Sequence, residues 1–462
     1  MSEFRGCHGL ILAAGLFLVS VAARADLYGA EAALAKQDLP RAFELYRELA
    51  EMGDLRGQEN LAAMYVGGEG VKRDNVLGYA WAVIAKENGG GEAAQSIVSQ
   101  LEPHVTATAR LKVAELQKQF GKAAIEKRWL PATPVSLLKV GGCNFRKIPN
   151  PANFFPVEAK KRGFSGKIMV GFTVDAAGYP HNPRVWFATP RDLFDDAARA
   201  LVMASTFDPK QQNGAAVPCS MRIMVKFVNP GGGEGDADIR KSFNEVKPKA
   251  LAGDPVSQAI YGILLATRPD LNASDESFMP WLTRAAQAGV PAAQFMVGMS
   301  VFDGFAAEVD EAKGLAWLNK AADAGNGDAQ VSLANYLMRI RGAGGDAVQA
   351  LHWLEKASAS GTRDGKYELA AMLAAHPDAA IRDPKRALTA VAELDPEHDA
   401  LPTALEIRAA AHAFMGDFGA ALLDQRQALR KARTLGWNLE PLKARIADYE
   451  AQKTWAGDLL AR

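Results

Sequence analysis

An interval of 36 residues recurs along the chain. In the second half it separates four glycines, Gly253, Gly289, Gly325 and Gly361. Three tryptophans keep the same interval, each eight residues before one of these glycines: Trp281, Trp317 and Trp353. The interval returns near the start, where Gly53 and Gly89 are 36 residues apart and Trp81 lies eight residues before the latter. A repeat of this length is typical of stacked helix pairs, which form a solenoid and present an extended surface.

The residues between these positions have the periodicity of helices. Ala42, Leu45, Tyr46 and Leu49 recur at the spacing of one helix face. Gly53 follows that helix and suits a left-handed C-terminal cap. We therefore expect helical repeats over 26–128 and 239–455. Their cores should contain the periodic tryptophans Trp81, Trp281, Trp317 and Trp353.

The first 25 residues have the features of a secretory signal peptide. Arg5 precedes an apolar run over 10–21, and Ala23-Arg24-Ala25 matches a cleavage site that leaves Asp26 as the first mature residue. The run is too short for an ordinary membrane span. We therefore predict an exported, periplasmic protein. The alternative is anchorage to the inner membrane through an uncleaved signal.

The charge balance argues against two classes of partner. The chain carries 53 basic and 53 acidic side chains, so its formal net charge is zero. Nucleic acids and anionic membranes both select a basic excess. We expect protein partners and no nucleic acid.

Between about 142 and 229 the periodicity changes from helix to strand. Residues 166–174 alternate, with Ile168, Val170 and Phe172 on one face, as in a half-buried strand. Thr189-Pro190 has the composition of a helix start, with the threonine as N-cap. Asn213-Gly214 predicts a tight turn before a long alternating strand over 217–227. The fold class expected is therefore mainly α, a helical-repeat solenoid with a small inserted α+β domain. A Gly-rich stretch over 230–238 predicts a flexible linker after that domain.

The repeats resemble the Sel-like repeat (SLR) branch of the tetratricopeptide superfamily. The resemblance rests on the ends Ala286-Gln287-Ala288-Gly289 and Ala322-Asp323-Ala324-Gly325, on the turn over 68–74, and on the tryptophan interval. It implies a scaffold for protein complexes, with a partner held in a concave groove of the repeats.

The inserted domain resembles the C-terminal domain of TonB-family energy transducers. The matching segments are Phe155-Pro156, Val170-x-Phe172-x-Val174-Asp175, Phe194-Asp195, Phe207-x-Pro209, Asn213-Gly214 and Val225-x-Phe227. Phe155 stands where the family usually has tyrosine. Transducers of this family also have a retained N-terminal membrane helix and a proline-rich spacer, and neither is recognisable in this sequence.

These resemblances imply a non-enzymatic periplasmic adaptor, binding proteins or extended peptide segments of the cell envelope, outer-membrane receptors among them. Peptide would add to the edge of the last strand, at Ser220, Arg222, Met224 and Lys226. The alternative is a TonB-type transducer component acting in receptor-mediated transport across the outer membrane. The seven histidines are scattered, and we expect no catalytic residue, no metal and no cofactor.

The cysteines predict a disulfide. Of three cysteines, Cys7 leaves with the signal peptide, and Cys143 and Cys219 remain within the inserted domain. Export takes both thiols to an oxidising compartment. The alternative is two independent buried thiols.

Overall fold

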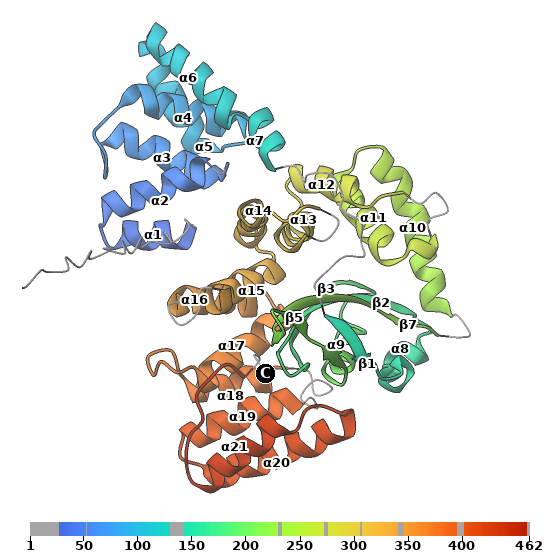
Figure 1. Cartoon of the computed structure of the whole chain (residues 1–462). Coiled ribbons are helices and arrows are strands. Elements are labelled where there is room, and N and C mark those ends of the chain that lie inside the picture. Colours follow the sequence, from blue (N-terminus) through green and yellow to red (C-terminus); the bar gives the residue numbers. More distant parts are fainter. Residues whose placement is uncertain are drawn as a thin grey trace, which may run out of the picture. The chain divides into compact units, whose positions relative to one another are not determined.

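The computed structural model describes residues 27–51, 53–129, 143–229, 233–271, 276–304, 307–340, 346–394 and 402–459 (Figure 1). The signal peptide predicted at 1–25 lies outside these residues. The chain divides into two compact units, with the boundary between Phe120 and Gly121. No helix among the described residues is long and apolar enough to cross a bilayer.

The first unit is a helical array. Its elements are α1 (Leu27–Ala35), α2 (Leu39–Glu51), α3 (Leu55–Gly67), α4 (Asn75–Glu87), α5 (Glu92–Leu101), η1 (Glu102–His104) and α6 (Ala107–Phe120). Asp54 and Asp74 cap the N-termini of α3 and α4 by accepting hydrogen bonds from backbone N–H groups. Tyr46, Leu61 and Trp81 pack in its core, and each is less than 5% exposed.

The second unit begins with α7 (Lys122–Trp129) and contains the longer array. The array's helices are α10 (Glu234–Leu251), α11 (Pro255–Thr267), α12 (Met279–Gln287), α13 (Pro291–Asp303), α14 (Glu311–Asp323), α15 (Gly327–Asn335), α16 (Ala347–Ala359), α17 (Arg363–Ala375), α18 (Pro384–Ala392), α19 (Pro402–Phe414), α20 (Phe418–Leu435) and α21 (Glu440–Glu450), with η3 (Pro269–Leu271) and η4 (Tyr336–Ile340) between them. The periodic glycines have positive φ, from 82° at Gly361 to 95° at Gly253. They therefore end helices in the left-handed conformation that glycine accepts at little cost.

A buried glutamine in each of several repeats closes the turn between paired helices. The Nε2 groups of Gln258, Gln294 and Gln330 donate to backbone oxygens eight residues earlier, at 3.3, 3.2 and 2.9 Å. Gln58 makes the same bond to Ala50 in the first unit at 3.2 Å. Gln258, Gln294 and Gln330 keep the 36-residue interval and are therefore a further repeat signal in the sequence.

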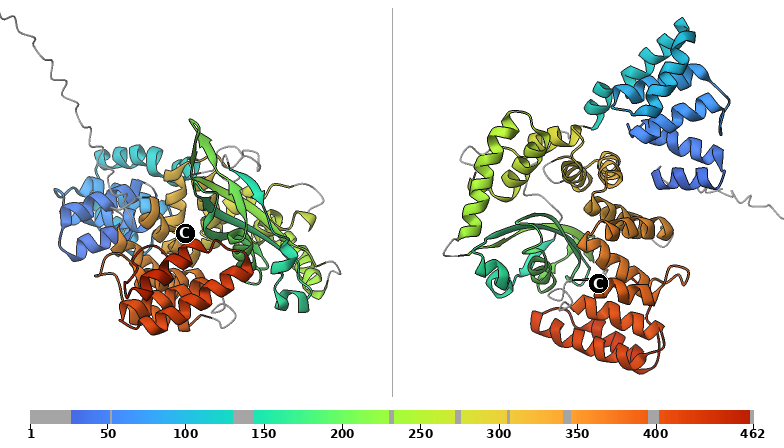
Figure 2. Two further views of the ribbon diagram at one scale, coloured as in Figure 1. Left: turned by 60° about the horizontal axis from the view of Figure 1, so that its bottom comes forward. Right: turned by 180° about the vertical axis from the view of Figure 1, so that it is seen from behind.

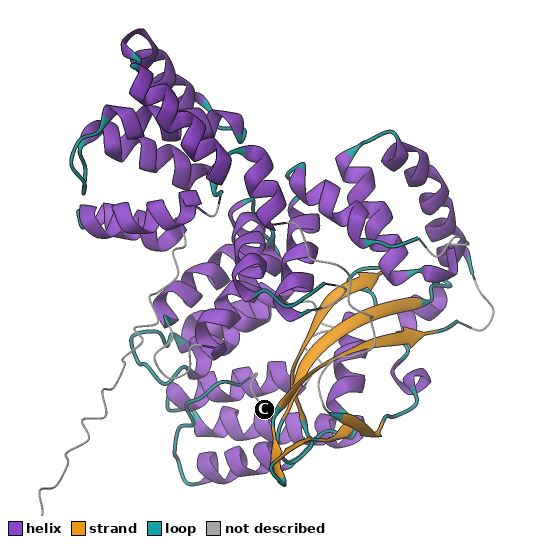
Figure 3. Ribbon diagram, turned by 45° about the horizontal axis from the view of Figure 1, so that its top comes forward, coloured by secondary structure: helices purple, strands orange, loops and turns teal. Residues whose placement is uncertain are grey.

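The inserted domain is a small α+β fold. Its central sheet has the antiparallel order β3-β2-β7, formed by β2 (Gly166–Val174), β3 (Pro180–Thr189) and β7 (Cys219–Phe227). Two further pairs are β1 (Asn144–Lys147) with β4 (Thr206–Asp208), and β5 (Lys210–Gln212) with β6 (Ala215–Val217). The helices are η2 (Pro151–Phe154), α8 (Val157–Lys161) and α9 (Asp195–Met203). The expected fold class, a repeat solenoid with an α+β insertion, is confirmed (Figure 3).

Two local predictions in and beside this domain were wrong. The helix expected to start at Thr189-Pro190 begins instead at Asp195. Thr189 remains in β3 because it pairs with Lys167 of β2. The linker predicted at 230–238 is helical from Glu234, the first residue of α10. Acidic side chains in the first turn of α10 favour that start, because they face the positive end of the helix dipole.

Candidate protein-binding site

Helix α9 joins the inserted domain (residues 143–229) to the last repeats. One face of α9 packs on the sheet through the fully buried Ala198 and Leu201. The opposite face, with Ala200 and Ala204, enters an apolar cluster with Trp437 and other side chains of α19 to α21. The helix is thus enclosed on both sides.

The other face of the sheet lies against the earlier repeats. Helices α11 and α13 contact β3, and Trp186 of β3 is 6% exposed. Gly171 of β2 leaves room for this indole, because a Cβ there would lie 2.7 Å from it. Figures 1 and 2 show the sheet inside the arc of the array. The inner face of these repeats, expected to hold a second partner, therefore holds the chain's own domain.

Ion pairs line this internal interface. Arg199 of α9 donates two hydrogen bonds to the Asp364 carboxylate, at 2.7 and 2.6 Å. The other pairs are Arg363–Asp196, Arg191–Asp328, Arg184–Glu368 and Lys167–Asp270. Four of the five basic partners belong to the inserted domain, whose residues 143–229 contain twelve basic and six acidic side chains. The signal that could have predicted this interface was that local basic excess in a neutral chain.

Burial changes the titration of several interface carboxyls. Desolvation raises the pKa of Asp195 to about 6, although Arg199 and Arg191 oppose that shift. Burial likewise raises the pKa of Asp328 and brings that of Asp303 to about 6. Hydrogen bonds from Arg268, with a further one from Lys167, hold the pKa of Asp270 well below its usual range. These shifts predict that the stability of the interface depends on pH.

The two edges of the sheet differ in regularity. Along β3 the register with β2 shifts twice, Asn182 has a φ of 53°, and Pro183 lacks an N–H. Along β7 all nine residues pair with β2 without a shift. Among the described residues β7 has β2 as its one strand neighbour. Since irregular strands and prolines discourage further pairing, β7 is the edge better suited to an added strand.

The sequence-predicted edge residues lie on one face of β7, in successive register with β2. Ser220 and Lys226 are exposed, whereas Arg222 and Met224 are partly buried. Arg222 reaches the array, where it donates to the carbonyl oxygen of Asp303 at the end of α13 and lies over the Trp186 ring. This side chain therefore also anchors the domain.

The stretch over 143–155 contacts β7 at both of its ends. At its start Cys143 forms a disulfide with Cys219, the first residue of β7, with a Cα–Cα distance of 6.3 Å. At its end the Phe155 ring meets that of Phe227, the last residue of β7, edge to face at 6.0 Å. Phe155, which replaces the family tyrosine, thus packs as an aromatic anchor.

Among the described residues, no group of three or more His, Cys, Asp or Glu side chains is placed to hold a metal ion.

Comparisons with known proteins agree with this architecture. The family model of the Gram-negative bacterial TonB protein C-terminal matches residues 151–228. The Sel1 repeat model matches residues 22–54, 55–90, 291–326 and 327–362. No curated protein matches the chain.

Two solved structures are similar to it. A Sel1 repeat protein from Oxalobacter formigenes is 31% identical over 28% of this chain and 97% of its own, with a TM-score of 0.25. The c5321 protective antigen of uropathogenic Escherichia coli, which displays an SLR fold, is 16% identical over 90% of this chain and 76% of its own, with a TM-score of 0.35.

Proposed function

The chain is a Sel1-repeat protein that carries a TonB C-terminal domain, and from this premise we propose that it is a non-enzymatic adaptor of the periplasm. Sel1 repeats and TonB C-terminal domains are typically modules of protein interaction rather than catalysis. We assign one partner to the TonB C-terminal domain and a second to the repeats of the first unit.

The observation that carries the proposal is the regular, nine-residue edge of β7. An extended segment of a partner would add to this edge as a fourth strand. Backbone hydrogen bonds would supply affinity, and alternate side chains would supply selectivity. The array packs on both sides of the domain and holds the β7 edge in a fixed conformation. The domain should therefore lose little conformational entropy when a partner strand binds.

A proline in β7 tests this mechanism. Met224→Pro removes a backbone donor from the strand, and we expect loss of partner capture from envelope extract while the array stays folded. Hydrogen exchange of β7 should slow when partner binds wild-type protein. Protection confined to the helical repeats would contradict binding at this edge.

The periplasmic location rests on the signal-like segment at 1–25. The alternative function, a transducer component retained in the inner membrane, requires that segment to stay attached. Mass spectrometry of the mature N-terminus distinguishes the two: a start at Asp26 supports the adaptor, and an intact start at Met1 supports the transducer.

A further inference from the structure

The two faces of β7 offer different chemistry to an added strand. Toward the array, the row over 220–226 is polar or basic at three of four positions and ends in the exposed Lys226. Toward the core, the residues are apolar, from Met221 to Phe227. Side chains directly opposite one another on paired strands lie on the same face. Successive side chains of an added strand would therefore meet in turn the array-side row, which contains the basic Arg222 and Lys226, and the apolar core-side row.

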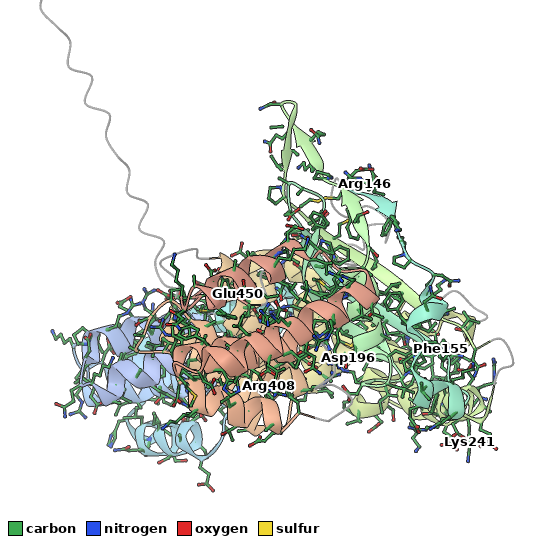
Figure 4. The ribbon with its side chains drawn as sticks, turned by 90° about the horizontal axis from the view of Figure 1, so that it is seen from below. Arg146, Phe155, Asp196, Lys241, Arg408 and Glu450 are labelled. Atoms are coloured by element: carbon green, nitrogen blue, oxygen red, sulfur yellow. A yellow bond between two sulfur atoms is a disulfide. The ribbon has the colours of Figure 1, made fainter. Side chains whose placement is uncertain are left out.

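Exposed apolar side chains flank the core side of this edge. The stretch over 143–155 contacts both ends of β7, through the Cys143–Cys219 disulfide and the Phe155–Phe227 ring pair. Within it Phe145 and Ile148 are each 46% exposed. Figure 4 shows Arg146 and Phe155 on the side of the domain turned away from Arg408 and Glu450 of the last repeats. The array thus leaves these apolar side chains uncovered.

The exposed surface of the domain has an excess of positive charge. The arginines of the domain that face the array are paired with acidic side chains of the array. The exposed lysines Lys147, Lys160, Lys161, Lys210 and Lys226 make no ion pair among the described residues. These lysines favour a ligand that brings carboxylates.

We propose that the β7 edge selects an extended segment in which apolar side chains alternate with acidic ones. The acidic side chains lie toward the array, beside Arg222 and Lys226. The apolar side chains lie toward Phe145 and Ile148. This inference rests on the proposed strand addition and names the chemistry of the segment that adds.

Nine-residue peptides, matched to the length of β7, test the inference on the whole chain. One alternates valine with glutamate, a second alternates valine with lysine, and a third has the composition of the first in scrambled order. We expect the alternating glutamate peptide to bind best, with affinity that falls as salt rises. Lys226→Glu should weaken it about 5- to 10-fold and strengthen the lysine peptide. The control, Lys385→Glu, makes the same change at an exposed site on α18 and should leave both affinities unchanged.

Each contrary result has its own meaning. If the glutamate and lysine peptides bind equally, the acidic selectivity is wrong. Strand addition still holds in that case if N-methylation of the peptide backbone abolishes binding. Equal binding of the scrambled peptide would overturn the alternation. If phosphatidylglycerol vesicles bind in place of any peptide, the basic surface serves a membrane and the inference is wrong. If no peptide binds and β7 exchange is unchanged, strand addition itself fails.

Discussion

Among single residues, the tryptophans of the 36-residue repeat should contribute strongly to the stability of the array. Trp317 is 5% exposed, and the ammonium group of Lys320 lies 5.4 Å from the centre of its ring. Trp317→Ala should therefore lower the free energy of unfolding of the second unit by about 3–5 kcal/mol. Chemical denaturation followed by circular dichroism measures this. Val348→Ala, at a position 60% exposed on α16, is the control, and equal midpoints for the two variants would contradict a core role for the indole.

Asp195 gives the interface a pH dependence. Burial raises its pKa from 3.8 to about 6, so the native state binds this proton more tightly than the unfolded chain does. The contribution of Asp195 to stability therefore falls as pH rises from about 4 to about 6. We expect Asp195→Asn to stabilise the second unit by roughly 1–3 kcal/mol near neutral pH and by little at pH about 4. Asp192→Asn, at a side chain 75% exposed, is the control. Destabilisation by Asp195→Asn at both pH values would show that its charge is needed.

The disulfide predicted from the cysteine count is present between Cys143 and Cys219. It links the first residue of β7 to Cys143, which lies 76 residues earlier in the sequence. Replacing both cysteines with serine should cost about 2–4 kcal/mol, mainly by freeing the unfolded chain. Unfolding of the oxidised protein and the double variant measures the difference. Two reactive thiols in denatured, non-reduced protein from the periplasm would mean that the bond does not form.

At the scale of elements, α9 and α17 are joined by ion pairs that should contribute more than surface pairs do. The side chains of Arg199 and Asp364 are 17% and 25% exposed, and one terminal nitrogen of the arginine donates to both carboxylate oxygens. A double-mutant cycle with alanine should give a coupling of about 1–3 kcal/mol. The Arg426–Glu450 pair, whose side chains are 54% and 52% exposed, should give about 0–1 kcal/mol. If the two pairs have similar coupling energies, the ion pairs of the internal interface contribute no more to stability than an exposed pair does.

Elements with strong local signals were predictable from the sequence. The strand over 166–174 and the Asn213-Gly214 turn follow from alternation and from residues that accept positive φ, observed at 51° and 78°. The start of α9 was not predictable, because pairing of Thr189 with β2 outweighed its capping preference. The packing of Arg199 and Trp186 on the array depends on contacts far apart in sequence, so the local basic excess indicates acidic partners without identifying them.

At the scale of the whole molecule, the array acts as a support that completes the TonB C-terminal domain. In TonB-like folds taken alone, both the outer face of α9 and the second face of the sheet would meet water. Here Ala200, Ala204 and Trp186 are each less than 10% exposed, because the repeats cover them. A domain of this size buries a small core by itself, so a large part of its stability should come from the repeats.

Excision of the domain tests this dependence. Residues 143–229 expressed alone should show a lower melting temperature and faster hydrogen exchange in β2 than the same residues within 121–462, the second unit. The reason is that removal of the array exposes the Trp186 side of the sheet and leaves Arg199 and Arg184 without their carboxylate partners. Circular dichroism and exchange mass spectrometry on both proteins, each with the disulfide intact, provide the comparison. Equal protection of β2 in the two proteins would show that the domain is self-sufficient, and the array would then position the β7 edge without stabilising it.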